Sequence, residues 1–266
     1  MTRRLGWIII GTTIAMAVIG PWIVPHDPQV QTLADRLQGP SWSHPFGLDE
    51  LGRDILARLV VGARISLGVG LAVVGSSAIL GVLIGAAAGY AGGVVDTLVG
   101  RLMDVLLAFP GILLAIALVA VMGPNLTNVV VALVSIGWVG YARLVRGQVL
   151  KVRELEYVQA ARALGAPMWR ILWQHVIPPT LPAVTVQATL GMAGVIIAEA
   201  SLSFLGLGVQ PPTPSWGTML DAGRAHLFDA PHLTVIPGVA IALLVLGFNF
   251  LGDALRDQID PRSTTT

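Results

Sequence analysis

A polar, charge-bearing stretch interrupts the apolar second half of the chain and reads Glu156-Tyr-Val-Gln-Ala-Ala-Arg-Ala-Leu-Gly-Ala-Pro-Met-Trp-Arg-Ile-Leu-Trp-Gln-His-Val-Ile-Pro-Pro-Thr-Leu-Pro182. Its Ala, Leu, Gln and Arg residues favour a helix from Glu156 to Leu164. Gly165 follows where a left-handed residue ends a helix, and Pro167 suits the first turn of a second helix. The prolines from Pro178 to Pro182 are expected to interrupt that helix before the next apolar run. The stretch predicts a compact helix–glycine corner–helix unit.

The composition around this unit is that of a membrane protein. The chain of 266 residues is 55% hydrophobic and 12% charged, whereas soluble domains carry roughly 25% charged residues. It has no cysteine, which excludes disulfides and thiolate metal sites. The net charge of +1 excludes a globally basic nucleic-acid binder.

Apolar runs divide the chain into six expected transmembrane helices, so the predicted fold class is an all-α membrane protein. Phe109-Pro110 is expected to kink the third helix, and the Gly-Pro-Asn stretch at 123–125 separates the third from the fourth. The first run is read as a retained span and not as a signal peptide, because it lacks a small-x-small cleavage site. The expected spans lie at about residues 5–24, 65–95, 105–122, 129–142, 181–205 and 233–252.

Orientation follows from the arginines. With both termini in the cytoplasm, the cytoplasmic segments hold most of the basic residues, as the positive-inside rule requires. We therefore divide the chain into a first helix with an external loop (1–64), a five-helix core (65–253) and a cytoplasmic tail (254–266). The polar stretch then belongs to a cytoplasmic loop at 147–180.

The external loop from Pro25 to Arg64 is polar and rich in proline. A short amphipathic helix is predicted from Leu48 to Val61, because the acids Asp49, Glu50 and Asp54 come early and the arginines Arg53, Arg58 and Arg64 come later, as a helix dipole prefers. His26, His44 and the nearby acids allow a metal-site reading. A solvated loop packed on the rim of the bundle is the favoured interpretation, and we predict no metal.

Three further features concern helix packing. Gly81, Gly85 and Gly89 recur every four residues, a spacing that lets another helix backbone approach closely in lipid. Arg101 and Asp104 stand three apart, and we expect them to pair at the cytoplasmic edge. Trp138 and Tyr141 are expected to form an aromatic pair at the membrane interface.

Glu199 is the one acid placed deep within an apolar run. Acids at such depth face protein or water and are functional candidates. Two interpretations stay open: a functional side chain on a water-filled pathway, and a helix-packing hydrogen bond to a neighbouring subunit. The Pro- and Gly-rich segment at 206–232, which contains Trp216, is expected to form a re-entrant or scoop-like loop on the outer face.

Enzymatic motifs are absent from the sequence. There is no phosphate-binding Gly-x-x-x-x-Gly-Lys-Ser/Thr loop, the five histidines lack zinc-ligand spacing, and no catalytic residues are assigned. Two classes of function remain: a permease subunit of an ATP-driven importer, and a gradient-driven secondary transporter or channel subunit. The second would favour an internal repeat and paired intramembrane charges, and neither is evident.

Four stretches carry a resemblance to a known family: Gln159-Ala-Ala with Gly165 and Ile177-Pro178, His44-Pro-Phe-Gly-Leu-Asp-Glu-Leu-Gly-Arg-Asp54, Gly140-Tyr-Ala-Arg-Leu-Val-Arg-Gly147, and Ala198-Glu-Ala-Ser-Leu-Ser-Phe-Leu-Gly-Leu-Gly-Val-Gln-Pro-Pro-Thr-Pro-Ser-Trp-Gly217. The first resembles the EAA loop of ATP-binding-cassette (ABC) importer permeases. Together they are similar to the C-type permease subunits of dipeptide, oligopeptide and nickel importers. Gln159 replaces the leading Glu of the motif, His175 replaces an aliphatic residue, and Ile177 replaces Leu.

The resemblance implies a type I ABC importer permease fold in the bacterial inner membrane. It implies these partners besides the lipid bilayer, and no nucleic acid: a homologous B-type permease, cytoplasmic ATPase subunits and an extracytoplasmic substrate-binding protein. ATP and Mg²⁺ would be bound by the ATPase subunits, so no cofactor is expected on this chain. The residues expected to couple to the ATPase are Gln159, Ala160, Ala161, Arg162, Gly165, Trp169 and Arg170. The residues expected on the pathway or a subunit interface are Glu199, Ser201, Ser203 and Trp216.

Overall fold

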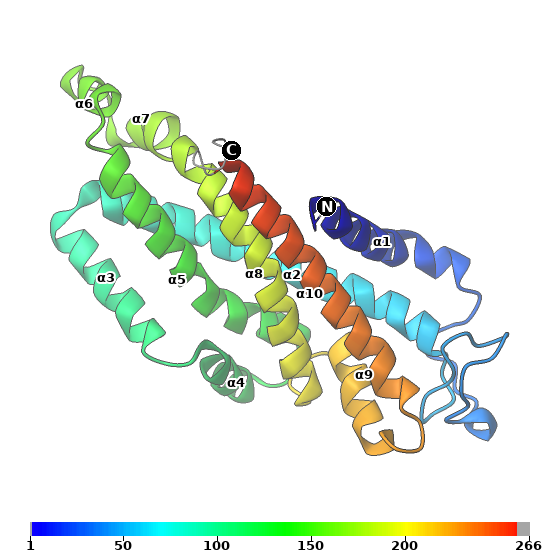
Figure 1. Cartoon of the computed structure of the whole chain (residues 1–266). Helices are drawn as coiled ribbons and strands as arrows, with labels where there is room; N and C mark the ends of the chain where they lie inside the picture. The colour runs from blue at the N-terminus through cyan, green and yellow to red at the C-terminus, as the bar shows by residue number, and fades with distance from the viewer. Residues whose placement is uncertain (1, 260–266) are drawn as a thin grey trace.

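The computed structural model describes residues 2–259, and the helices in that range form one elongated bundle (Figure 1). Arg262, expected in the cytoplasmic tail, lies outside the described residues. The longer helices of the bundle are α1 (Thr2–Ile23), α2 (Ile55–Ala91), α3 (Gly93–Leu107), α4 (Gly111–Met122), α5 (Leu126–Val152), α8 (Leu181–Phe204) and α10 (His232–Ile259). Shorter helices are α6 (Glu156–Ala163), α7 (Met168–Ile171) and α9 (Trp216–Gly223).

Within residues 2–259, five helical segments are long and apolar enough to cross a membrane, and α3 with α4 forms a sixth candidate that is bent by 86°. The kink expected at Phe109-Pro110 is therefore a break between two helices. Pro110 lacks an amide hydrogen and holds an extended ψ of 120° at the start of α4, which stops α3 from continuing. Both helices of the bent pair contact α5. Asp104 of α3 forms an ion pair with it before the break, and Val119 of α4 packs against it after the break.

The centre of the bundle is the pair of α2 and α5, which share more contacts than any other two helices. The glycine stripe of α2 makes this approach possible. A Cβ added at Gly81 would meet the Tyr141 Cβ, and one at Gly85 would meet the Ala142 backbone. At Gly89 it would lie 3.1 Å from the carbonyl oxygen of Arg146. The stripe lies along α5, where small residues allow close van der Waals packing between backbones.

The external loop differs from its prediction. The expected amphipathic helix from Leu48 to Val61 does not form as one unit: residues 48–54 make a tight loop, closed by a bridge between Leu48 and Asp54. The loop ends at Asp54, whose side chain accepts the Ala57 amide hydrogen as the N-cap of α2. From Ile55 the chain then runs through the membrane-spanning segment without interruption, so the expected boundary at residue 64 lies inside a helix.

Two expected side-chain pairings also differ. Asp104 pairs with Arg143 of α5 at 2.7 Å and not with Arg101, because α3 lies beside α5 and turns this carboxylate toward it. Nearby, Asp96 forms an ion pair with Arg146, which fastens the start of α3 to α5. Trp138 and Tyr141 are buried rather than interfacial, because the face of α5 that carries them packs on the glycine stripe of α2.

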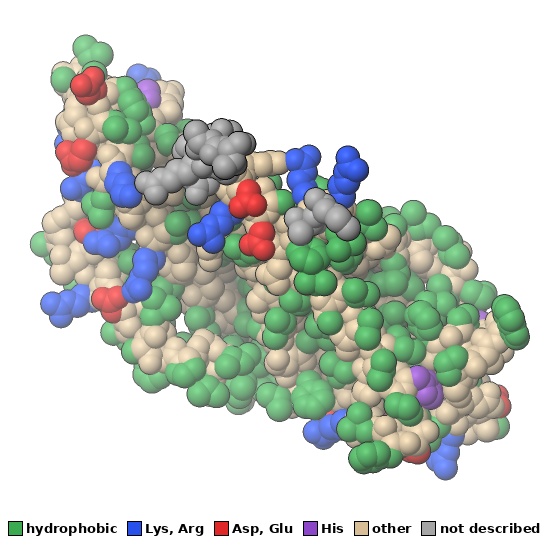
Figure 2. Space-filling model, viewed as in Figure 1, with side chains coloured by type: hydrophobic (Ala, Val, Ile, Leu, Met, Phe, Trp, Pro, Cys, Tyr) green, Lys and Arg blue, Asp and Glu red, His purple; other side chains and the backbone are tan. Residues whose placement is uncertain are grey.

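The two ends of the bundle differ in chemistry. Figure 1 shows α6, α7, the start of α1 and the end of α10 toward one end, with α9 and the loop after α1 at the other. In Figure 2, charged side chains gather toward the α6–α7 end, while the middle of the visible face is largely hydrophobic. This pattern fits a membrane belt with a charged rim at the α6–α7 end.

Candidate functional site

The candidate site is the α6–α7 corner, which we define as residues 156–171. Helix α6 ends at Ala163, and Gly165 follows the C-cap residue Leu164 with a φ of +77°, as the sequence predicts. The Gly165 amide donates to the Arg162 carbonyl at 3.0 Å, and the Ala166 amide donates to the Ala161 carbonyl at 3.1 Å. These two bonds form a Schellman motif, which satisfies carbonyls that the end of a helix leaves free. Nothing lies within 4 Å of a Cβ added at Gly165, so backbone conformation alone favours glycine there.

The chain beyond the corner stays helical, contrary to expectation. Helix α7 continues into a π-helical turn at Leu172–Val176 and a short 3₁₀ turn at Pro178–Thr180. Helix α8 then starts directly at Leu181. The wider π turn is closed by the Ile177 amide donating to the Leu172 carbonyl at 2.8 Å. The prolines start the next turns, where a missing amide hydrogen leaves no bond unmade. The corner is therefore mounted on the end of a spanning helix.

Buried side chains hold the corner in place. Val158 of α6, Ile171 of α7 and Val176 of the π turn are all nearly inaccessible and join the main hydrophobic core. The Tyr157 hydroxyl donates to the His175 carbonyl at 3.4 Å, and the Gln159 side-chain amide donates to the Arg153 carbonyl at 3.0 Å. His175, unusual for the motif, thus has its ring edge-on to Tyr157 and its carbonyl engaged.

The opposite side of the corner is apolar and exposed. Leu164 at the turn is 88% exposed, Trp169 is 61% exposed, and Met168 between them is 44% exposed. A soluble surface rarely gathers large apolar side chains at one tip without a binding role. Arg170 places its guanidinium 5.7 Å from the Trp169 ring centre, so a cation borders this patch.

The remaining predicted coupling residues surround the patch. Gln159 and Ala160 are exposed on α6, and Ala161 is partly buried against the core. Arg162 lies over the ring of Tyr90, at the end of α2, at 5.3 Å. Through this contact with Tyr90 the corner touches α2, so a displacement of the corner would disturb the packing at the end of α2.

Glu199 does not occupy the position expected for it. The residue is fully buried inside this one chain, where its carboxylate accepts hydrogen bonds from the Ser203 hydroxyl at 2.8 Å and the Ser66 hydroxyl at 3.2 Å. Ser66 belongs to α2, so the carboxylate joins α8 to α2. This corrects the prediction that Glu199 faces a pathway or a neighbouring subunit, because the packing of α2 on α8 encloses it.

Ser203 and Trp216 belong to the same buried region and are corrected in the same way. Trp216 is 1% exposed, and its indole donates to the Leu59 carbonyl of α2 at 2.9 Å. Ser215 caps α9 through a reciprocal pair with Thr218. The segment expected to form a scoop-like loop is thus packed against α2 at Trp216. Ser201 alone of the four is partly exposed, with its hydroxyl donating to the Ile197 carbonyl.

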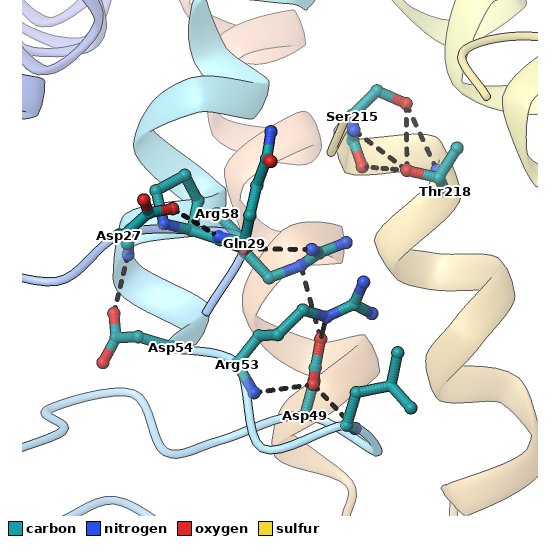
Figure 3. Close-up of polar contacts among 11 residues, drawn as sticks. Asp27, Gln29, Asp49, Arg53, Asp54, Arg58, Ser215 and Thr218 are labelled. Carbon is teal, nitrogen blue, oxygen red and sulfur yellow. Dashed lines mark hydrogen bonds and ion pairs between the residues drawn. The ribbon is translucent and has the colours of Figure 1, made fainter. Parts of the chain in front are cut away.

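An ionic network at the end of the bundle opposite the α6–α7 corner was missed by sequence reasoning. The Asp49 carboxylate accepts a hydrogen bond from the Arg53 Nε at 2.7 Å and lies 3.4 Å from the Arg58 Nε (Figure 3). Its other carboxylate oxygen accepts the amides of Leu51 and Arg53, each at 2.9 Å. The sequence signal for this network was the spacing of Asp49 from the two arginines, four residues before Arg53 and nine before Arg58. It was read as a helix dipole pattern, although Gly52 allows a tight loop there.

His26, His44 and Asp54 are the group nearest to a metal site within residues 2–259, with ligand atoms within 4.8 Å of one another. His44 Nδ1 lies 2.8 Å from the Asp54 carboxylate, whose other oxygen caps α2. Hydrogen bonding and helix capping account for this arrangement, which keeps the end of α1 beside the start of α2.

Comparison with known proteins places the chain among membrane transport components. The family described as the binding-protein-dependent transport system inner membrane component matches residues 81–265. The dipeptide transport system permease protein of Alkalihalophilus pseudofirmus is 45% identical over 258 residues, covering 97% of this chain and 85% of that protein. The glutathione transport system permease protein of Pectobacterium atrosepticum is 46% identical, covering 94% and 83% respectively.

A solved structure shares the fold. An inward-facing structure of the MetNI methionine ABC transporter aligns with a TM-score of 0.55, covering 74% of this chain and 95% of that chain at 20% identity. The order of helices α2 to α10, with the α6–α7 corner between α5 and α8, is therefore a type I permease arrangement.

Proposed function

The chain belongs to the binding-protein-dependent transport system inner membrane component family, and from this membership we propose that it is one permease subunit of an ABC importer for short peptides. It would form half of the translocation pathway with a homologous B-type permease in the bacterial inner membrane. An extracytoplasmic binding protein would deliver the cargo to the outer mouth. The family membership disfavours the gradient-driven transporter.

One observation supports the coupling role above others: the side of the α6–α7 corner that faces the bundle is packed in the core, and the opposite side exposes apolar side chains. Val158 and Ile171 are buried, while Leu164 and Trp169 stand out from the surface. A groove on an ATPase subunit that accepted Leu164, Met168 and Trp169 would bury their apolar surface and leave Arg170 for acids at its rim. Because the corner continues directly into α8, movement of a docked ATPase would be transmitted to a spanning helix.

Energy for transport has to come from another chain, since this sequence holds no phosphate-binding loop. Closure of two ATPase subunits around ATP would draw two such corners together and switch the pathway between outward-facing and inward-facing states. Two exposed apolar faces, on α3–α4 and on α1 with α10, are open to lipid or to the second permease.

The cargo proposal rests on the relatives. One is named for dipeptide transport and another for glutathione transport, and both of these substrates are short peptides with free carboxylates. We extend that class to this chain. Selection among short peptides would be made chiefly by the binding protein.

The test is reconstitution of the chain in liposomes with its permease, ATPase and binding-protein partners. We expect labelled dipeptide uptake that requires ATP on the ATPase side and the binding protein on the other. An ionophore that collapses ion gradients should leave uptake unchanged. Uptake that persists without ATP and stops with the ionophore would contradict the proposed function.

A further inference from the structure

A polar pocket of about 270 Å³ lies at the outer end of the molecule, away from the α6–α7 corner. Its walls come from three segments: the tight loop before α2, the segment after α8, and α9. The residues used below are Arg53, Arg58, Ser203, Thr213 and Thr218, all of which line it. The loop that carries Arg53 and the segment that carries Thr213 are more than 150 residues apart in sequence, so the pocket is a product of the fold.

Two arginines in this wall are almost entirely buried. Arg53 is 7% exposed and Arg58 is 5% exposed. Both lie beside the single carboxylate of Asp49. The lining also holds two acids: Glu50, which lies 3.8 Å from the His226 ring and balances the second arginine, and Asp221, which pairs with Arg224 at 3.0 Å.

The guanidinium of Arg53 is only partly used. Its Nε donates to Asp49, and neither Nη has a hydrogen-bond partner within residues 2–259. In Figure 3 the Arg53 fork extends beyond Asp49 toward the side on which Ser215 and Thr218 lie. An arginine fork with two parallel donors matches a carboxylate in geometry.

The packing around the pocket fixes this arginine in place. The Arg53 amide is held by Asp49, and the Asp49 amide donates to the Arg53 carbonyl at 3.0 Å. Ser203, at the floor, is engaged with Glu199, and Thr218 is engaged with Ser215. The donors are thus preorganised, and a ligand would not have to order them.

We infer that this pocket binds a carboxylate presented from the outer side of the membrane, with the Arg53 guanidinium as its principal donor and Arg58 as the second cation. The carboxylate could come from a free short peptide or from an acidic side chain of a docked protein. Binding at this pocket does not require an ATPase subunit, so its failure would leave the proposed function standing.

The test uses single cysteines, because the chain has none of its own. Thr213→Cys places a thiol on the exposed wall of the pocket, and Phe228→Cys places one on a fully exposed residue of the same end as a matched control. Spheroplasts that carry the assembled transporter are treated with a membrane-impermeant maleimide, and labelling of this chain is followed over time. The probes are alanyl-alanine, its C-terminal amide and acetate.

Alanyl-alanine should slow labelling at Thr213→Cys and not at Phe228→Cys, and amidation should raise the half-protecting concentration about tenfold or more, as expected for loss of a charge-assisted pair. Acetate that protects as well as the dipeptide would assign the carboxylate to a protein side chain, and weaker protection by acetate would assign it to a free peptide. Equal protection by the amide would overturn the inference.

Two variants attribute the protection to Arg53. Arg53→Gln in the Thr213→Cys background should abolish it. Arg53→Lys keeps the charge beside Asp49 but lacks the fork, so protection should weaken and the dipeptide-to-amide ratio should fall. If Arg53→Gln fails to reach the membrane, Arg53→Lys still decides the question, and an unchanged ratio in that variant would overturn the inference.

Discussion

The α6–α7 corner and the region around the start of α2 contain similar residues, but the corner exposes them and the other region buries them. Trp169 in the corner is 61% exposed and has no hydrogen bond from its indole within residues 2–259, whereas Trp216 is 1% exposed and donates to the Leu59 carbonyl. The acids and serines of the outer region are likewise enclosed and bonded to one another. The difference indicates that the outer region holds this chain together, while the corner is completed by another protein.

The largest expected effect is on folding and comes from Trp216→Ala. Truncation of a fully buried tryptophan removes its packing and leaves the Leu59 carbonyl without its indole donor, at about 3–5 kcal/mol of unfolding free energy. Trp169→Ala is the matched variant and should leave the unfolding temperature nearly unchanged while reducing uptake. Thermal unfolding of the purified chain in detergent measures both. Equal destabilisation by the two variants would remove the contrast between the regions.

A smaller effect on stability is expected at Glu199. Glu199→Leu leaves the hydroxyls of Ser66 and Ser203 without their shared acceptor, at about 1–3 kcal/mol for a buried unsatisfied group. Glu199→Gln keeps one acceptor and should recover most of that loss. The readout is again thermal unfolding, with uptake measured in parallel. Wild-type stability together with lost uptake in Glu199→Gln would restore the pathway interpretation that its burial contradicts.

Gly165→Val tests the corner and should change global stability least. A β-branched residue at φ +77° is strained by about 1–3 kcal/mol, and the local strain is relieved by moving α7, which lies at the edge of the core. We expect normal membrane levels and loss of ATP-dependent uptake. Gly165→Asn is the control, since asparagine tolerates the left-handed region and should retain much of the activity. Normal uptake in Gly165→Val would show that the corner geometry is dispensable.

The sequence predicts the parts of the fold that depend on local chemistry. The glycine corner and the close-packing stripe of α2 follow from chain conformation and side-chain size, and the structure shows both. Of the six expected apolar spans, five are helices long enough to cross a membrane within residues 2–259, and the sixth is the bent pair of α3 and α4. Partners across the bundle were predicted less well. Asp104 was assigned to its sequence neighbour Arg101, although the real partner, Arg143, is 39 residues away on α5.

The same limitation explains the site residues. Depth in an apolar run marked Glu199 as unusual, but only the third dimension shows that Ser66, 133 residues earlier, faces it. The buried arginines of this pocket were missed because their charges suggested a short amphipathic helix in a solvated loop. The turn that buries them depends on Asp49 accepting two backbone amides, a contact that no helical or strand periodicity encodes.

Docking of the α6–α7 corner on an ATPase subunit is tested most directly by a disulfide. Met168→Cys would be the only thiol in this chain, on a residue that is 44% exposed beside Trp169. Paired with cysteines placed along the groove of the ATPase subunit, it should form a cross-link whose yield changes between nucleotide-free and ATP-trapped states. Phe228→Cys, at the outer end, should give none. Absence of any cross-link or co-purifying ATPase in every nucleotide state would contradict the account.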